Sequence, residues 1–171
     1  MLTVHYCRAW GGDDRTMWQP LTERTAKRRY EDGGKWFSAV IGDVSEPDCV
    51  LEINPQSPYR ITVKFFDGHG STLLSYGFWL MEPGQLFLKH VVRWEYPEDG
   101  VFHSMNEATL IEDVFWEKPD GVVRRELQQG NSVSVEGYRD VPIDANWEPY
   151  PAFGDFASIA RRDRDDPPGQ A

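Results

Sequence analysis

The chain has 171 residues, of which 40% are hydrophobic and 13% aromatic, which is enough apolar material for the core of one domain. A formal net charge of −10 disfavours phosphate backbones and anionic lipid surfaces, so we expect neither nucleic acid nor membrane as a partner. Two cysteines form no disulfide framework, and no basic leader precedes a long apolar run, so we expect a cytoplasmic protein.

The first 35 residues predict little regular structure. Leu2, Val4 and Tyr6 alternate with polar residues, which predicts a short strand over residues 1–7. The following stretch to residue 35 is polar and rich in glycine. Pro20 suits a first helical position, so a short helix is expected from near Pro20 to about Tyr30.

From Trp36 onward, short apolar-alternating runs are separated by turn sequences at near-regular spacing. Strands are predicted over residues 36–42, 49–54, 59–66, 72–81, 85–96, 107–117, 122–128 and 133–139. The separators supply Gly or Pro for tight turns, and no helix-length pattern interrupts the strands. An all-β, antiparallel up-and-down barrel of 8–10 strands is therefore expected, because closure removes exposed edges; a β-sandwich is the alternative.

The sequence after the last strand divides into two parts. Residues 140–160 hold three prolines and several aromatic residues, which predicts an extended segment packed on the body. Residues 161–171 are charged and lack core residues, which predicts a flexible tail. The domain is therefore expected to be a single β domain over residues 1–160.

The strand over residues 85–96 carries the main catalytic candidate, His90. Alternation places on one face Leu86, Leu88, His90, Val92, Trp94 and Tyr96, and we expect this face to point inward. A buried imidazole with a shifted pKa can act as a general acid or base. The alternative is a core histidine with both ring nitrogens hydrogen-bonded.

A second catalytic candidate, Glu112, lies on the strand that follows. Glu112 shares a face with Val114 and Trp116, whereas Ile111 and Phe115 occupy the other face, so the sequence leaves open which face is inward. If the first face is inward, a pair between Glu112 and His90 could orient and charge the imidazole. A buried carboxylate without a partner would cost several kcal/mol or raise its pKa.

Seven Trp, seven Tyr and nine Phe indicate a β core, a ligand cavity, or both. The candidate ligand-binding residues are Trp94, Tyr76, Trp116, Trp79 and Arg60. Arg60 could bind a ligand carboxylate if it points inward, but a solvent-facing position is the alternative that its neighbours favour. The four histidines and two cysteines show no ligand spacing, so neither a metal site nor a cofactor is expected.

Gly34-Lys35-Trp36-Phe37, at the entry to the first long strand, resembles the Gly-x-Trp-aromatic element of the calycin superfamily, the lipocalin-like barrels. The resemblance implies that Trp36 packs across one barrel end and that a late-strand arginine, matched here to Arg139, lies over it. It also implies that the barrel binds a small apolar ligand. A few cytoplasmic barrels of similar shape act as cofactor-free cyclases or isomerases, so the resemblance leaves catalysis open.

Two functions from different classes follow from these features. The first is a barrel that binds a small apolar or aromatic molecule, or acts on it as a cofactor-independent cyclase, isomerase or lyase. An enclosed cavity reached by His90 would favour this function. The second is an acidic protein-binding module of the antitoxin or immunity type that neutralises a basic partner. A homodimer formed through an apolar strand face is a further alternative.

Overall fold

A computed structural model of the chain describes residues 2–164. Its strands are Val4–Gly11 (β1), Thr16–Leu21 (β2), Phe37–Gly42 (β3), Pro47–Ile53 (β4), Tyr59–Phe66 (β5), Thr72–Glu82 (β6), Gln85–Glu95 (β7), Leu110–Phe115 (β8), Val123–Gln129 (β9), Ser132–Tyr138 (β10) and Trp147–Pro149 (β11). One α-helix, α1, spans Glu23–Asp32, and 3₁₀ turns span Met105–Glu107 (η1) and Asp144–Asn146 (η2).

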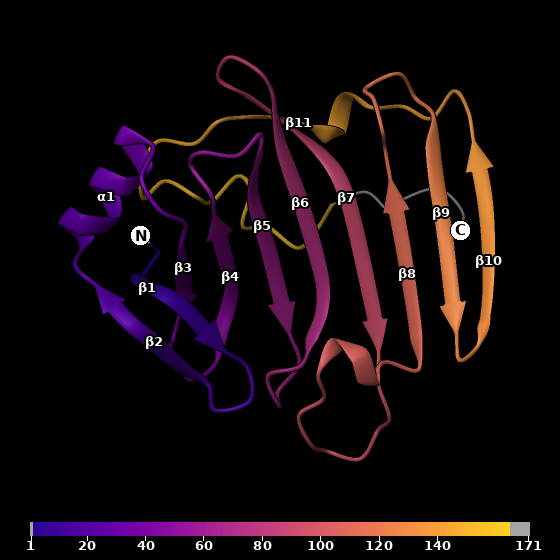
Figure 1. Cartoon of the computed structure of the whole chain (residues 1–171), viewed down its shortest axis with the longest axis horizontal. Coiled ribbons are helices and arrows are strands. Elements are labelled where there is room, and N and C mark those ends of the chain that lie inside the picture. The colour runs from indigo at the N-terminus through magenta and orange to yellow at the C-terminus, as the bar shows by residue number, and fades with distance from the viewer. Residues whose placement is uncertain (1, 165–171) are drawn as a thin grey trace.

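All strands belong to one antiparallel sheet with the order β10-β9-β8-β7-β6-β5-β4-β3-β1-β2, and β11 pairs with the start of β7 (Figure 1). From β3 to β10 each strand pairs with the next one along the chain, so the predicted all-β, up-and-down antiparallel arrangement is confirmed. Within residues 2–164 the ladder does not close, because β2 and β10 are its two ends. Gly84 and Gly130 adopt positive φ at the tight turns after β6 and β9.

The helix begins later than the sequence predicted. Pro20 lies in β2, opposite Cys7 on β1, and Thr22 is the N-cap, whose Oγ1 accepts a hydrogen bond from the Thr25 backbone N–H at 3.2 Å. Gly33 ends the helix in the left-handed region, with φ of 72°. The sequence did not predict β2, since four of its six residues are exposed and its apolar residues do not alternate with polar ones.

One face of the sheet is covered by α1 and by residues 150–164, which run behind the strands in Figure 1. We call this side the covered face and the opposite side the open face. Tyr30 of α1 stacks on Tyr150 and donates its hydroxyl hydrogen bond to the Pro151 carbonyl at 2.7 Å. Phe37, Phe78 and Phe156 are fully buried between sheet and cover. The expected packing of the aromatic C-terminal segment on the body is therefore observed, and side chains fill the space beneath it.

The covering segment continues past residue 160. Arg161 and Arg164 both form ion pairs with Glu148, with N–O distances of 3.1 and 2.9 Å. The Arg164 guanidinium lies 4.9 Å from the ring centre of Phe78. Residues 161–164 thus belong to the folded body rather than to the expected tail, and residues 165–171 lie outside the described residues. No helix within residues 2–164 has the length and apolar character needed to cross a membrane.

Candidate functional site

The position of His90 is set by a β-bulge in β7. Gly77 of β6 pairs with His90, whereas the next residue, Phe78, pairs with Leu88, so Lys89 is an extra residue in the ladder. The bulge reverses the side-chain alternation: Leu88 packs in the core of the covered face, and His90 lies on the open face. The expectation that His90 shares an inward face with Leu86 and Leu88 is therefore wrong.

His90 forms a pair with an acidic residue, but with a different one from that expected. Its Nε2 lies 2.7 Å from Oδ1 of Asp113 on β8, and the two side chains are 30% and 37% exposed. Glu112 points to the covered face, where it is 5% exposed and lies 2.7 Å from Arg125 and 3.6 Å from Arg93. Glu112 therefore faces inward, which answers the question that the sequence left open. The expected pair between His90 and Glu112 is wrong.

Tyr59 of β5 lies near His90, across Gly77, and lines a hollow in the open face. It lies over Gly77, where an added Cβ would be 2.5 Å from the Tyr59 hydroxyl and 3.1 Å from Cβ of His90. Burial raises the pKa of Tyr59, a hydrogen bond with Thr62 lowers it, and the charges of Glu52 and Asp113 raise it further. The hollow has a volume of about 300 Å³ and is lined by Trp36, Glu52, Ile53, Asn54, Tyr59 and Thr62.

Two of the aromatic residues expected to bind a ligand lie on the open face. Trp79 packs against Tyr59, with ring centres 5.6 Å apart. The ammonium of Lys89 lies 3.9 Å from the Trp79 ring centre and 5.4 Å from that of Phe115, and Lys89 is only 8% exposed. Trp94 follows His90 by four residues in the same strand, opposite Ile111. Trp79 therefore belongs to the surroundings of the hollow, while Trp94 lies further along β7.

The other expected binding residues lie elsewhere. Tyr76 is on the covered face, where its hydroxyl donates to the Arg162 carbonyl at 3.0 Å. Trp116 is buried in the same core, and its indole Nε1 has no acceptor among residues 2–164. Arg60 donates to the Pro55 carbonyl and lies 5.8 Å from the Tyr150 ring centre. These three residues do not line the hollow beside Tyr59.

The arginine that contacts Trp36 is Arg8 of the first strand, and not Arg139, the late-strand position matched to the resemblance. The Arg8 guanidinium lies 4.0 Å from the centre of the Trp36 ring. Arg139 follows β10, the outermost strand at the other side of the sheet. Trp36 is 37% exposed and lines the hollow together with Tyr59.

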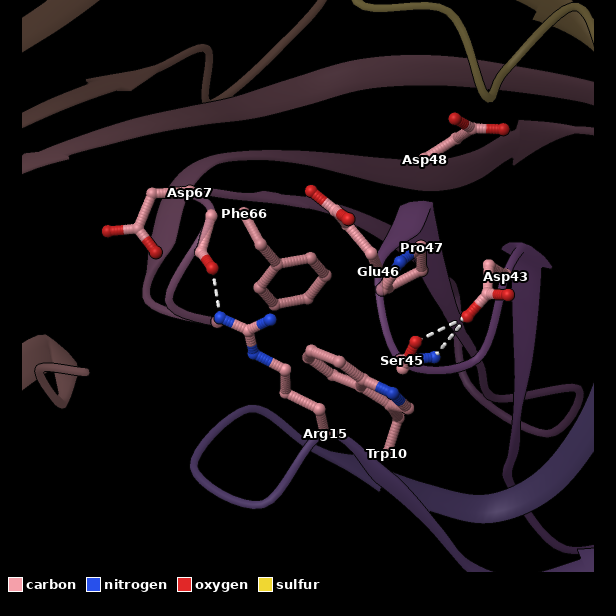
Figure 2. Close-up of a pocket in the computed structure, with 11 residues that line it drawn as sticks. Trp10, Arg15, Asp43, Ser45, Glu46, Pro47, Asp48, Phe66 and Asp67 are labelled. Carbon is pink, nitrogen blue, oxygen red and sulfur yellow. Dashed lines mark hydrogen bonds between the residues drawn. The ribbon is translucent and has the colours of Figure 1, made fainter. Parts of the chain in front are cut away.

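A second hollow, of about 530 Å³, is lined in part by Trp10 and Phe66, whose ring centres are 4.6 Å apart. Figure 2 shows these two rings side by side, with Arg15 reaching past them to the Gly68 carbonyl. Four of the lining residues are acidic: Asp43, Glu46, Asp48 and Asp67. Hydrogen bonds from the hydroxyl and backbone N–H of Ser45 lower the pKa of Asp43, so its carboxylate stays ionised. This hollow is strongly acidic.

Comparisons with family models, with curated proteins and with solved structures find no match. The fold therefore defines only a class: an all-β protein whose single antiparallel sheet has one covered and one open face. Among residues 2–164, no group of three or more His, Cys, Asp or Glu is arranged to hold a metal ion.

Sequence reasoning missed Asp113, Tyr59, Thr62 and Glu52 as site residues. Three of these residues could have been noticed in the sequence, because Glu52, Thr62 and Asp113 are polar residues within strands of the same sheet. Strand alternation assigns such residues to a solvent face, and that face is where the hollow lies.

Proposed function

We propose that this protein binds a small molecule in the open-face hollow beside Tyr59. The observation that supports this is the combination of an exposed indole, a carboxylate and a half-buried phenol around one cavity of about 300 Å³. Binding sites typically combine apolar walls with a few polar groups that fix orientation. On the covered face, the aromatic side chains pack against one another in the core.

The same proposal gives His90 a chemical role. His90 does not line the hollow, so it would act on a ligand that extends past Tyr59: with its Nε2–H donated to Asp113, the Nδ1 atom can accept a proton from such a ligand. The Asp113 carboxylate then stabilises the imidazolium that forms. A cofactor-independent proton transfer, as an isomerase or lyase requires, is therefore the reaction class that we propose for the site.

A fragment screen by ligand-observed NMR tests the binding proposal. Thr62→Trp places an indole into the hollow, so compounds that bind the wild-type protein should lose their saturation-transfer signal. Gln128→Trp is the matched control, because Gln128 is exposed on β9, away from the hollow. Compounds whose saturation-transfer signal is the same with Thr62→Trp as with the wild type bind outside this hollow, and that result would refute the proposal.

The second candidate function, an acidic module that binds a basic protein, is favoured by the hollow of Figure 2. Four carboxylates gather there beside Trp10 and Phe66, and such a surface complements a basic partner. Native mass spectrometry of the protein isolated from cells separates the two functions. A retained small molecule supports the first function, and a retained basic chain supports the second.

We also propose that the protein acts in the cytoplasm. Cys7 and Cys49 are free and buried, as thiols commonly are in a reducing compartment. Burial raises the pKa of the Cys7 thiol to about 11 and that of Cys49 to about 12, so both are protonated and unreactive at neutral pH.

A further inference from the structure

A basic hollow adjoins the hollow beside Tyr59. It has a volume of about 560 Å³ and is lined by Arg8, Trp18, Gln19, Arg29, Lys35, Trp36, Asn54 and Gln56. Trp36 and Asn54 line both hollows, so one ligand can extend from the first into the second. Three of the lining residues are cationic and none is acidic, in a chain with 28 acidic and 18 basic residues.

The cations in this basic hollow converge without an acidic partner. Nη1 of Arg8 and Nη1 of Arg29 lie 3.3 and 3.4 Å from the same atom, the carbonyl oxygen of Trp36. Within residues 2–164, no carboxylate forms an ion pair with Arg8, Arg29 or Lys35. The two guanidiniums repel each other, a repulsion that water and salt reduce at this exposed site and that an anion bound between them would offset.

Local structure fixes this convergence. Gly33 ends α1 in the left-handed conformation, and the Gly34 N–H donates to the Arg29 carbonyl at 2.8 Å. A Cβ at Gly34 would lie 2.9 Å from Cα of Arg29, so the chain passes tightly against the helix end. The turn therefore brings Lys35 and Trp36 back beside Arg29.

The guanidinium of Arg8 is held by its stacking on Trp36. Nη1 of Arg8 faces the Trp36 carbonyl, and the remaining N–H groups of the guanidinium over the ring stay available to a carboxylate or phosphate. Trp36 thus has one role in each hollow: it orients Arg8 on one side and lines the cavity beside Tyr59 on the other.

We infer that the ligand of the open-face hollow carries an oxyanion, a carboxylate or a phosphate, that is bound by Arg8, Arg29 and Lys35. This inference rests on the proposed function, because the rest of the ligand occupies the hollow beside Tyr59. The ligand class is therefore a small molecule with an apolar or aromatic body and one anionic end. A purely neutral ligand would leave the converging cations uncompensated.

Isothermal titration calorimetry with 2-naphthol, 2-naphthoate and 2-naphthyl phosphate tests the inference at fixed ionic strength. The anions should bind the wild-type protein at least about tenfold more tightly than the neutral naphthol. The double variant Arg8→Gln with Arg29→Gln should lose that advantage while its affinity for naphthol stays within about twofold. The naphthoate and phosphate arms show which oxyanion the site prefers.

Two controls accompany this titration. The double variant Arg24→Gln with Arg28→Gln removes the same charge from exposed positions of α1 that do not line the basic hollow, and should bind all three compounds as the wild type does. Arg29→Gln alone leaves the stacking of Arg8 on Trp36 in place and should show part of the loss. Thermal unfolding verifies that each variant is folded.

The possible outcomes distinguish a failure of the inference from a failure of the proposed function. Equal binding of naphthol and its anions, or an equal loss in the Arg24 and Arg28 variant, would overturn the inference and leave the proposed function standing. Binding of the anions alone, lost with Arg8 and Arg29 but insensitive to Thr62→Trp, would keep an anion site and refute the proposed hollow. If none of the three compounds binds, the inference fails, and the proposed function is decided by the fragment screen with Thr62→Trp.

Discussion

Gly77 shows how a single residue shapes the open-face hollow. A methyl group at this position would meet the Tyr59 hydroxyl at 2.5 Å and its ring at 2.8 Å, distances at which atoms must move apart. Tyr59 would have to leave its place, and Tyr59 lines the hollow. The close contact of β5 on β6 therefore needs a glycine.

We predict that Gly77→Ala destabilises the fold by about 1–3 kcal/mol, as overpacking at a filled position does. Urea denaturation followed by tryptophan fluorescence measures this free energy of unfolding. Gly137→Ala is the matched control, because Gly137 also lies in a strand but a Cβ there meets no atom within 4 Å. Equal stability of Gly77→Ala and wild type would contradict the packing described for Tyr59.

His103, in the segment between β7 and β8, provides a test that depends on pH. Its Nε2 lies 2.8 Å from Oδ1 of Asp99, and its ring stacks on Tyr96. The hydrogen bond with Asp99 raises the pKa of His103 above its ordinary value of 6.5, opposed by desolvation and aided by the charges of Asp99 and Glu107. Folding therefore favours the protonated imidazole.

We predict that this stabilising contribution is complete below the unfolded-state pKa of His103 and is lost as pH rises through the raised folded-state pKa. Proton NMR of the imidazole C–H signals gives the folded value directly. Asp99→Asn should lower the pKa of His103, since the variant removes the carboxylate that accepts its hydrogen bond. A titration unchanged by Asp99→Asn would show that this pair does not form.

At the scale of elements, a buried ion pair helps to hold the covering segment, residues 150–164, on the sheet. The Arg164 side chain is 4% exposed and the Glu148 side chain 11% exposed, and burial lowers the pKa of Arg164 while Glu148 opposes that change. Glu148 belongs to β11, which pairs with β7, so this contact ties the end of the segment to the sheet. The cover therefore holds at two places: the aromatic cluster around Tyr30 and the pair at Glu148.

We predict that Glu148→Ala destabilises the protein by about 3–5 kcal/mol, because it leaves a buried guanidinium without its carboxylate. Arg161→Ala removes the more exposed partner of the same carboxylate and should cost under about 1 kcal/mol. Thermal unfolding of both variants compares the two effects. Similar small shifts in both would mean that the cover is held by its aromatic residues alone.

Most elements could be predicted from the sequence because they are strands with clear turn residues between them. The strands from β3 to β10 match the predicted ranges closely; β5, for example, spans the predicted residues 59–66. The short strand β11 was not predicted. β2 escaped prediction because an edge strand with exposed Trp18 and Pro20 shows no buried periodicity. The bulge at Lys89 also escaped, since alternation counting assumes a regular ladder, and this one residue moved His90 to the other face.

At the scale of the whole molecule, the sheet separates a structural face from a candidate functional face. The covered face buries its aromatics beneath α1 and residues 150–164, so it contributes stability. The open face leaves polar and aromatic side chains around the hollow beside Tyr59, and the adjoining basic hollow also includes Arg29 of α1. The net charge of −10 does not predict this site, because the basic hollow that adjoins the hollow beside Tyr59 has the opposite sign.

Amide chemical-shift mapping with the tightest compound from the fragment screen tests the central claim most directly. A small molecule in the open-face hollow should shift the amides of Glu52, Asn54, Tyr59 and Thr62, together with the side-chain signals of Trp36. Covered-face residues such as Val63 and Phe78 should stay unchanged beyond small relayed effects. Shifts concentrated around the acidic hollow of Figure 2, or at the edge strand β10, would contradict the claim that this hollow is the binding site.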